Sequence, residues 1–114
     1  MPYINTVSTK EINKEKKNAL TRAYGEAIEL LPGKSEKWLM LKFEGNADMA
    51  FAGDTEGDFA MVEVELLGNS SAEAMGKLTG RISEILDEVL GIPSDKVYVK
   101  YFSTPTWGWS GENL

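Results

Sequence analysis

The chain repeats one strand–helix–strand pattern, and this duplication constrains the fold more than any other feature of the sequence. Residues 35–37 (Ser-Glu-Lys) recur 59 positions later as residues 94–96 (Ser-Asp-Lys), and Phe43 matches Phe102 at the same spacing. Each half has a helical apolar pattern between two strand-like segments, so the expected order is β-α-β, a loop, then β-α-β. The expected strands cover residues 2–7, 38–43, 59–67 and 97–102.

Each expected helix has its own start and stop signals. Residues 8–11 (Ser-Thr-Lys-Glu) and 70–73 (Ser-Ser-Ala-Glu) have the form of a capping box, with serine at the N-cap and glutamate three residues later. Apolar residues at helical spacing follow each box. Pro32-Gly33 and Gly91-Ile92-Pro93 are expected to end the two helices.

Right-handed crossovers place both helices on one face of a four-stranded mixed sheet. We therefore expect a single α/β domain over residues 1–114, built from two pseudo-symmetric β-α-β units. The other face of the sheet has no helix to cover it, and both possible sets of side chains there are partly apolar. This favours a symmetric oligomer that covers the face. Alternation along the strands gives the open face one of two sets of side chains. One set is Trp38, Met40, Lys42, Tyr98, Lys100 and Phe102, and the other consists of the alternate residues of the same strands.

The composition excludes several classes of function. The sequence has no histidine and no cysteine, which removes His-based triads, thiolate nucleophiles, disulfides and Cys- or His-based metal sites. Its formal charge of −6 is opposite in sign to that of a nucleic-acid binder. It has neither an apolar run of the ~20 residues that span a membrane nor a conventional export signal. A base for proton transfer near neutral pH must come from a group other than histidine.

Several motifs follow one another in order along nearly the whole chain. They are Met1-Pro2-Tyr3-Ile4-Asn5-Thr6, Pro32-Gly33-Lys34, Met49-Ala50-Phe51-Ala52-Gly53, the stretch from Ile92 to Tyr101, and Trp107-Gly108-Trp109-Ser110-Gly111. With these motifs the chain resembles the tautomerase superfamily, and in particular its macrophage migration inhibitory factor branch. That resemblance implies a homotrimer with an active site between subunits, no metal and no organic cofactor.

The resemblance implies that Met1 is removed and that the secondary amine of Pro2 becomes the catalytic base. An α-amine has an ordinary pKa of about 7.7–8.0, which burial and a nearby cation lower. A neutral amine near pH 7 can take a proton from carbon. Lys34 matches the family lysine that pairs with the substrate carboxylate. The alternatives are that Pro2 only begins an edge strand and that Lys34 only meets the dipole at a helix C-terminus.

Further substrate-binding positions follow from the same resemblance. The backbone N–H of Leu67 is expected to bind the substrate, and Tyr98 is expected to come from the adjacent subunit. Lys100 replaces an asparagine of the best-known pattern, which adds a second positive charge near the mouth of the site and leaves the identity of the substrate open. The expected apolar walls, each of which has core or interface packing as its alternative, are Tyr3, Trp38, Trp107 and Leu114.

The function that the resemblance implies is keto–enol tautomerisation of aromatic α-keto acids, the work of an isomerase. Phenylpyruvate and 4-hydroxyphenylpyruvate are the expected substrates, with dopachrome as a further candidate. The alternative is a cytokine-like protein that binds a cell-surface receptor and whose tautomerase site is vestigial. The expected location is the cytoplasm, with non-classical export to the outside as an addition. No nucleic acid and no membrane is expected as a partner.

Overall fold

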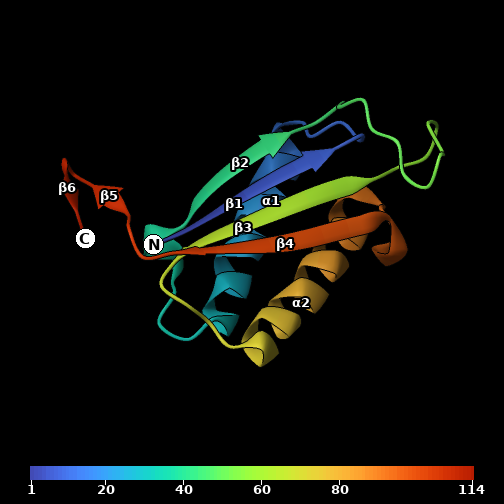
Figure 1. Ribbon diagram of the computed structural model, residues 1–114. Coiled ribbons are helices and arrows are strands. Elements are labelled where there is room, and N and C mark those ends of the chain that lie inside the picture. The colour runs from blue at the N-terminus through green and yellow to red at the C-terminus, as the bar shows by residue number, and fades with distance from the viewer.

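A four-stranded mixed sheet forms the centre of the computed structural model, which describes residues 1–114 (Figure 1). The strand order is β2-β1-β3-β4. Strand β1 (Pro2–Ser8) runs parallel to β2 (Met40–Glu44), and β3 (Ala60–Leu67) runs parallel to β4 (Val97–Thr104). The two parallel pairs are joined by antiparallel pairing of β1 with β3. This arrangement confirms the duplicated β-α-β architecture.

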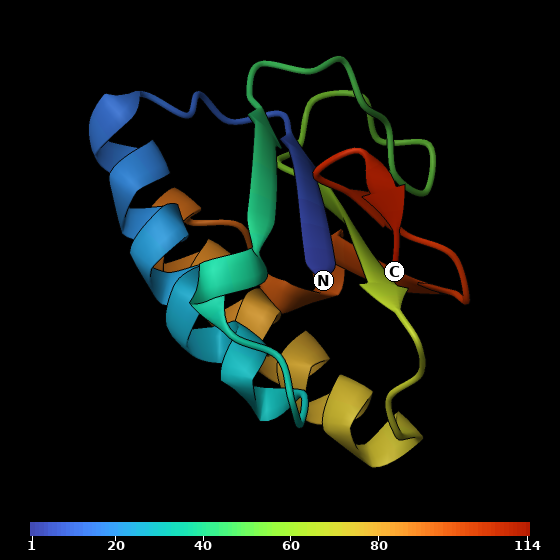
Figure 2. The same cartoon turned by 90° about the vertical axis from the view of Figure 1, so that its left-hand side faces the viewer.

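Helices α1 (Lys14–Ala27) and α2 (Ala72–Leu90) both cover the same face of the sheet, as expected (Figures 1 and 2). The core lies between helices and sheet, where alternate side chains of β1 and β3 are buried. Tyr24 and Thr6 bring two hydroxyl groups into this core. Their oxygens lie 2.9 Å apart, so each hydroxyl has a hydrogen-bond partner. No helix is long and apolar enough to cross a membrane.

Both helices begin later than the capping boxes indicate. Ser8 belongs to β1, where it pairs with Ala60, because extension of the sheet ladder takes precedence over a cap at this residue. The side chain of Asn13 caps α1 instead, accepting the N–H of Lys16 at 2.9 Å. In the second unit the cap is Ser71, one residue after the expected position, and it accepts the N–H of Ala74 at 3.1 Å.

Short 3₁₀ turns shift other boundaries. Helix α1 ends at Ala27 and continues as η1 (Ile28–Leu30), before the expected stop at residues 32–33. The segment η2 (Glu36–Trp38) includes Trp38, which we expected in a strand, and β2 begins only at Met40. Its counterpart in the second unit is η3 (Ser94–Lys96), directly before β4.

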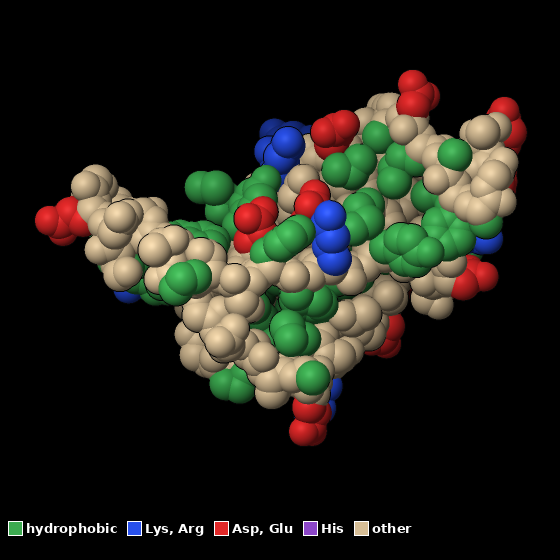
Figure 3. Space-filling model, viewed as in Figure 1, with side chains coloured by type: hydrophobic (Ala, Val, Ile, Leu, Met, Phe, Trp, Pro, Cys, Tyr) green, Lys and Arg blue, Asp and Glu red, His purple; other side chains and the backbone are tan.

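The sheet face opposite the helices is open in the single chain. Met40, Tyr98 and Phe102 are 67%, 61% and 46% exposed there. This confirms the alternation pattern that contains these residues, except for Trp38, which lies outside the strand. Figure 3 shows hydrophobic side chains over the strands with Lys and Glu side chains among them. One polar row crosses all the strands in register, formed by Lys42, Asn5, Glu63 and Lys100.

The corrected cap of α2 is testable with two neighbouring serines. Ser71→Ala should lower the free energy of unfolding by about 1 kcal/mol, because it removes the side-chain acceptor at the N-cap. Ser70→Ala is the matched control and should change it by less than about 0.5 kcal/mol. Urea denaturation followed by circular dichroism measures both. A larger loss at Ser70 than at Ser71 would contradict this assignment.

Candidate functional site

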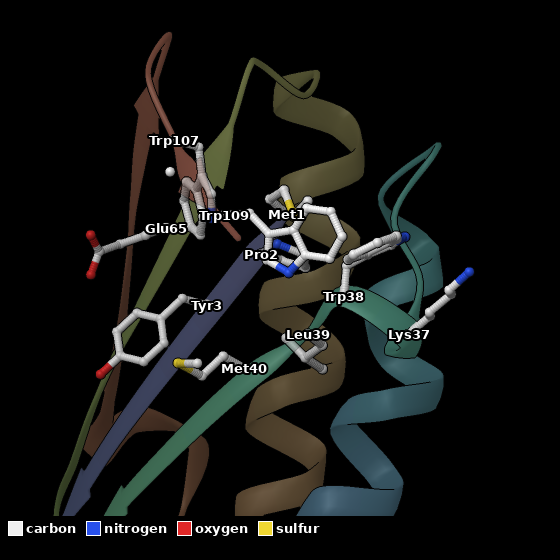
Figure 4. A pocket seen from close by; sticks show the side chains of 11 residues that line it. Met1, Pro2, Tyr3, Lys37, Trp38, Leu39, Met40, Glu65, Trp107 and Trp109 are labelled. Atoms are coloured by element: carbon white, nitrogen blue, oxygen red, sulfur yellow. The ribbon is translucent and has the colours of Figure 1, made fainter. Parts of the chain in front are cut away.

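A hollow of about 780 Å³ lies where the start of β1, the turn η2 and the C-terminal hairpin meet (Figure 4). The hairpin consists of β5 (Gly108–Trp109) and β6 (Glu112–Asn113) and extends away from the sheet beside the N-terminus (Figure 1). The lining is mostly apolar, as in small-molecule sites. It is formed by Met1, Pro2, Tyr3, Lys37, Trp38, Leu39, Met40, Glu65, Trp107, Gly108 and Trp109.

Pro2 is the first residue of β1 and is buried opposite Leu66 of β3. In this chain its nitrogen is part of the peptide bond to Met1. The carbonyl oxygen of Met1 accepts the backbone N–H of Leu67 at 3.1 Å. The N–H that the sequence assigned to substrate binding therefore lies beside the start of β1, and a carbonyl oxygen of the chain itself occupies it. Neither Leu67 nor Lys34 is among the residues that line the hollow.

Lys34 binds the other backbone polar group of Leu67, its carbonyl oxygen. Its side-chain ammonium donates to the carbonyl oxygen of Leu67 at 2.8 Å. Its backbone follows Gly33, whose positive φ of 81° turns the chain after η1. The fold thus brings Pro2, Lys34 and Leu67 together from three separate stretches of the sequence.

The α-amine of Met1 responds to this environment. Partial burial, and secondly the positive charge of Lys34, lower the pKa of this amine below its ordinary value of 8.0. Both causes disfavour the protonated form. The site therefore favours a neutral amine at the N-terminal end of the chain.

Aromatic rings form the wall of the hollow. The rings of Trp38 and Trp109 meet edge to face at 5.1 Å and 90°. The ammonium of Lys37 lies 5.2 Å from the centre of the Trp38 ring. Trp38 is 38% exposed, so it is a rim residue of the hollow and not part of the core.

Sequence reasoning placed Tyr3, Trp38 and Trp107 at the wall, and all three line the hollow. The two tryptophans of the Gly-flanked tail predict docking on a neighbour or a pocket wall, but only Trp107 was assigned a wall position and the place of Trp109 was left open. The signal that could have found it is the two-residue turn after it, which folds the tail back as a hairpin. The lining also includes residues that carried no sequence signal of their own, namely Lys37, Leu39, Met40 and Glu65.

Tyr98, by contrast, lies far from Pro2 within one chain. Tyr98 is paired with Met61 of β3, whereas Pro2 is paired with Leu66. Five residues of an extended strand separate these positions by roughly 17 Å. One copy of the chain therefore does not bring Tyr98 into its own hollow.

Lys100 and Leu114 also lie outside the hollow. The ammonium of Lys100 is 3.5 Å from a carboxylate oxygen of Glu63 and 5.2 Å from the centre of the Phe102 ring. The second positive charge expected from the sequence is thus offset by Glu63. Leu114 is 54% exposed, and its backbone N–H donates to the carbonyl oxygen of Trp107 at 2.9 Å. It supports the base of the hairpin rather than a wall.

Comparison with known proteins gives a consistent picture. The family model described as macrophage migration inhibitory factor (MIF) matches residues 1–114. The structure of MIF2 from Leishmania major is 32% identical, with a TM-score of 0.93, and the match covers 100% of this chain and 97% of that one. A comparison with curated proteins gave no match.

Two further solved structures extend the likeness. A macrophage migration inhibitory factor homologue from Prochlorococcus marinus is 27% identical, with a TM-score of 0.87 and 97% of each chain covered. Pt0534, solved after inactivation by 2-oxo-3-pentynoate, is 22% identical with a TM-score of 0.80, and the match covers 96% of this chain and 92% of that one. At this lower identity, the likeness to Pt0534 concerns the fold.

The influence of Lys34 on the terminal amine can be measured directly. Lys34→Ala should raise the pKa of the α-amine, because it removes a neighbouring positive charge. The pKa should stay below 8.0, since burial is the larger cause. An NMR titration of protein reductively methylated with labelled formaldehyde measures it. Lys37→Ala removes a lysine that does line the hollow. It is the control and should leave the value unchanged, because Lys34 is the only charge that lowers this pKa. Equal effects of the two variants would contradict the assignment.

Proposed function

The chain belongs to the macrophage migration inhibitory factor family, and from this premise we propose that it is a keto–enol tautomerase of aromatic α-keto acids. Phenylpyruvate and 4-hydroxyphenylpyruvate are the proposed substrates. The proposed base is the secondary amine of Pro2, which exists once Met1 has been removed. Family membership supports isomerase chemistry, and the substrate class and the base are our proposal.

The observation that carries the proposal is the hydrogen bond from Leu67 N–H to the carbonyl oxygen of Met1. The Met1 carbonyl is joined to the nitrogen of Pro2 by their peptide bond, so this hydrogen bond places the Leu67 N–H close to that nitrogen. Removal of Met1 converts that nitrogen from an amide to an amine and makes the Leu67 donor available. A carbonyl or carboxylate oxygen of a substrate can then accept the same N–H, which holds the substrate next to the base.

The electrostatics of the site fit a proline base. The burial and the Lys34 charge that lower the pKa of the Met1 amine act on the same end of β1. The Pro2 amine lies one residue further into the fold, so it is subject to the same two influences. A neutral amine at pH 7 is the protonation state that a general base needs.

The proposed reaction begins with the keto acid in the hollow. The Pro2 amine takes a proton from the carbon between the ring and the ketone, so that an N–H bond forms as the C–H bond breaks. The C–H electron pair becomes the new carbon–carbon double bond, the carbonyl electron pair moves to oxygen, and this oxygen takes a proton from water. The protonated amine then returns its proton to water, which completes the isomerisation without net oxidation.

The remaining groups bind and orient the substrate. The ammonium of Lys34 has three donors, so it can keep its bond to Leu67 while it binds the carboxylate. The edge-to-face pair of Trp38 and Trp109 supplies an apolar surface for the aromatic ring. Inactivation of the structurally similar Pt0534 by 2-oxo-3-pentynoate, itself an α-keto acid, is in keeping with this substrate class.

We further propose that the working form is a homotrimer. The open sheet face is partly apolar, and Tyr98 lies at the end of the sheet away from its own hollow. In a trimer, Tyr98 would complete the pocket of a neighbouring copy, with Lys100 two residues further along the same face. The family resemblance is the source of this arrangement.

The second candidate is a cytokine-like protein that binds a cell-surface receptor, with a vestigial catalytic site. The whole-chain family match supports this candidate as well as the enzyme. The proposed location is the cytoplasm, with non-classical export added if the receptor function holds. Retention of receptor binding by a catalytically inactive Pro2 variant would separate the two functions.

Replacement of the proposed base gives the test of catalysis. Pro2→Gly should lower kcat/KM for enolisation of phenylpyruvate by about 100-fold or more, because the rigid secondary amine is lost. Wild-type activity should rise with pH through the pKa of the Pro2 amine, since only the neutral amine accepts a proton. Ultraviolet absorbance of the enol follows the reaction.

Pro93→Gly is the matched control, because Pro93 is exposed and lies outside the hollow. It should leave kcat/KM within about twofold of the wild type. Full activity in Pro2→Gly, with circular dichroism unchanged, would rule out Pro2 as the base.

A further inference from the structure

The internal duplication extends to two tight hairpins that lie outside the β-α-β units. Residues 51–54 and residues 109–112 are 58 positions apart, and each closes a two-residue turn. Two successive left-handed residues form each turn, which is the geometry of a type I′ hairpin. The φ values agree within 2°, being 53° and 81° at Ala52 and Gly53 and 53° and 83° at Ser110 and Gly111.

Each hairpin carries an aromatic residue to the opposite half of the chain. The ring of Trp109, which follows β4, lies 5.1 Å from Trp38 before β2. The ring of Phe51, which follows β2, lies 5.0 Å from Tyr98 in β4. A lysine accompanies each pair, with Lys96 lying 5.5 Å from the Phe51 ring as Lys37 lies beside Trp38. Each end of the sheet thus carries a pair of aromatic rings with a lysine beside it.

At the Phe51 end, the contacts run from the core to the surface. Phe59 is 2% exposed and stacks with Phe51 at 5.8 Å. Phe51 in turn contacts Tyr98, which is 61% exposed. Strand pairing fixes the backbone of Tyr98, but an exposed side chain can still occupy several rotamers. Phe51 is the ring that restricts this choice, because it is itself packed against a buried residue.

We infer that Phe51 is a positioning residue for substrate binding, which holds the Tyr98 ring in the orientation it needs to wall the pocket of a neighbouring copy. The inference rests on the proposed function, in which Tyr98 contacts the aromatic end of the substrate. The type I′ turn holds Phe51 in place, and the lysine beside it favours the same position through a cation–π contact. Fixing the Tyr98 rotamer before binding reduces the entropy lost when the substrate binds.

Phe51→Leu is the informative substitution, because leucine keeps an apolar contact with Phe59 but loses the ring. It should raise the Kd of 3-phenylpropanoate and the KM of phenylpyruvate about 3- to 10-fold, the range that aromatic pairs contribute. The value of kcat should stay within about twofold, since Phe51 does not touch the reacting atoms. Phe51→Tyr keeps the ring and should restore both binding constants.

Two further variants separate positioning from a general structural role. Met49→Leu changes the same loop at a residue that lines a different hollow, and it should leave the Kd unchanged. In a Tyr98→Ala background, Phe51→Leu should change the Kd by less than about 1.5-fold, because its effect passes through Tyr98. Calorimetry with 3-phenylpropanoate, which cannot enolise, measures binding independently of catalysis.

The outcomes distinguish the inference from the proposed function. Three results would overturn the positioning role. They are equal Kd values for the wild type and Phe51→Leu, a full effect of Phe51→Leu in the Tyr98→Ala background, and no binding of 3-phenylpropanoate by the wild type. Binding by the wild type without enolisation of phenylpyruvate would overturn the tautomerase proposal, while the Kd series would still decide the role of Phe51.

Discussion

The antiparallel pairing of β1 with β3 is the constraint on which the site depends. It joins the two parallel strand pairs, and its register sets the second residue of the chain opposite Leu66 at the end of β3. The backbone groups of Leu67 then lie between the N-terminus and the ammonium of Lys34. No histidine or cysteine is needed for proton transfer in such a site, because a backbone amine at the chain terminus takes that role in the proposed mechanism.

The duplication has a second consequence, because it gives the sheet two similar ends. One end holds Pro2 and the tryptophan pair, and the other holds Phe51 and Tyr98. The two ends lie too far apart to form one pocket within a single chain. In the proposed trimer, each pocket would take one end from each of two copies. Lys100 pairs with Glu63 on the open face, so it does not add the net positive charge near the mouth of the site that the sequence predicts.

Sequence reasoning predicted the order of elements and one open face of the sheet, because alternation and helical spacing are local signals. It left two alternative sets of side chains for that face, and the structure decides between them. It misplaced the helix starts, since Ser8 satisfies the capping pattern but is held in the sheet by its partner Ala60. The positions of Pro2, Lys34 and Leu67 followed from the resemblance, and the structure places them together. The place of Trp109 was left open because it depends on the hairpin. Whether Tyr98 reaches a pocket depends on a contact between copies that a single sequence does not specify.

In the proposed mechanism, the peptide bond between Met1 and Pro2 keeps the site inactive, and removal of Met1 makes it active. The most direct measurement compares two samples of the unaltered sequence, one with Met1 removed and one with Met1 retained, each verified by mass spectrometry. The processed protein should enolise phenylpyruvate, and the unprocessed protein should not, because its Pro2 nitrogen is an amide and its Leu67 N–H is occupied. Equal activity of the two samples would contradict the account.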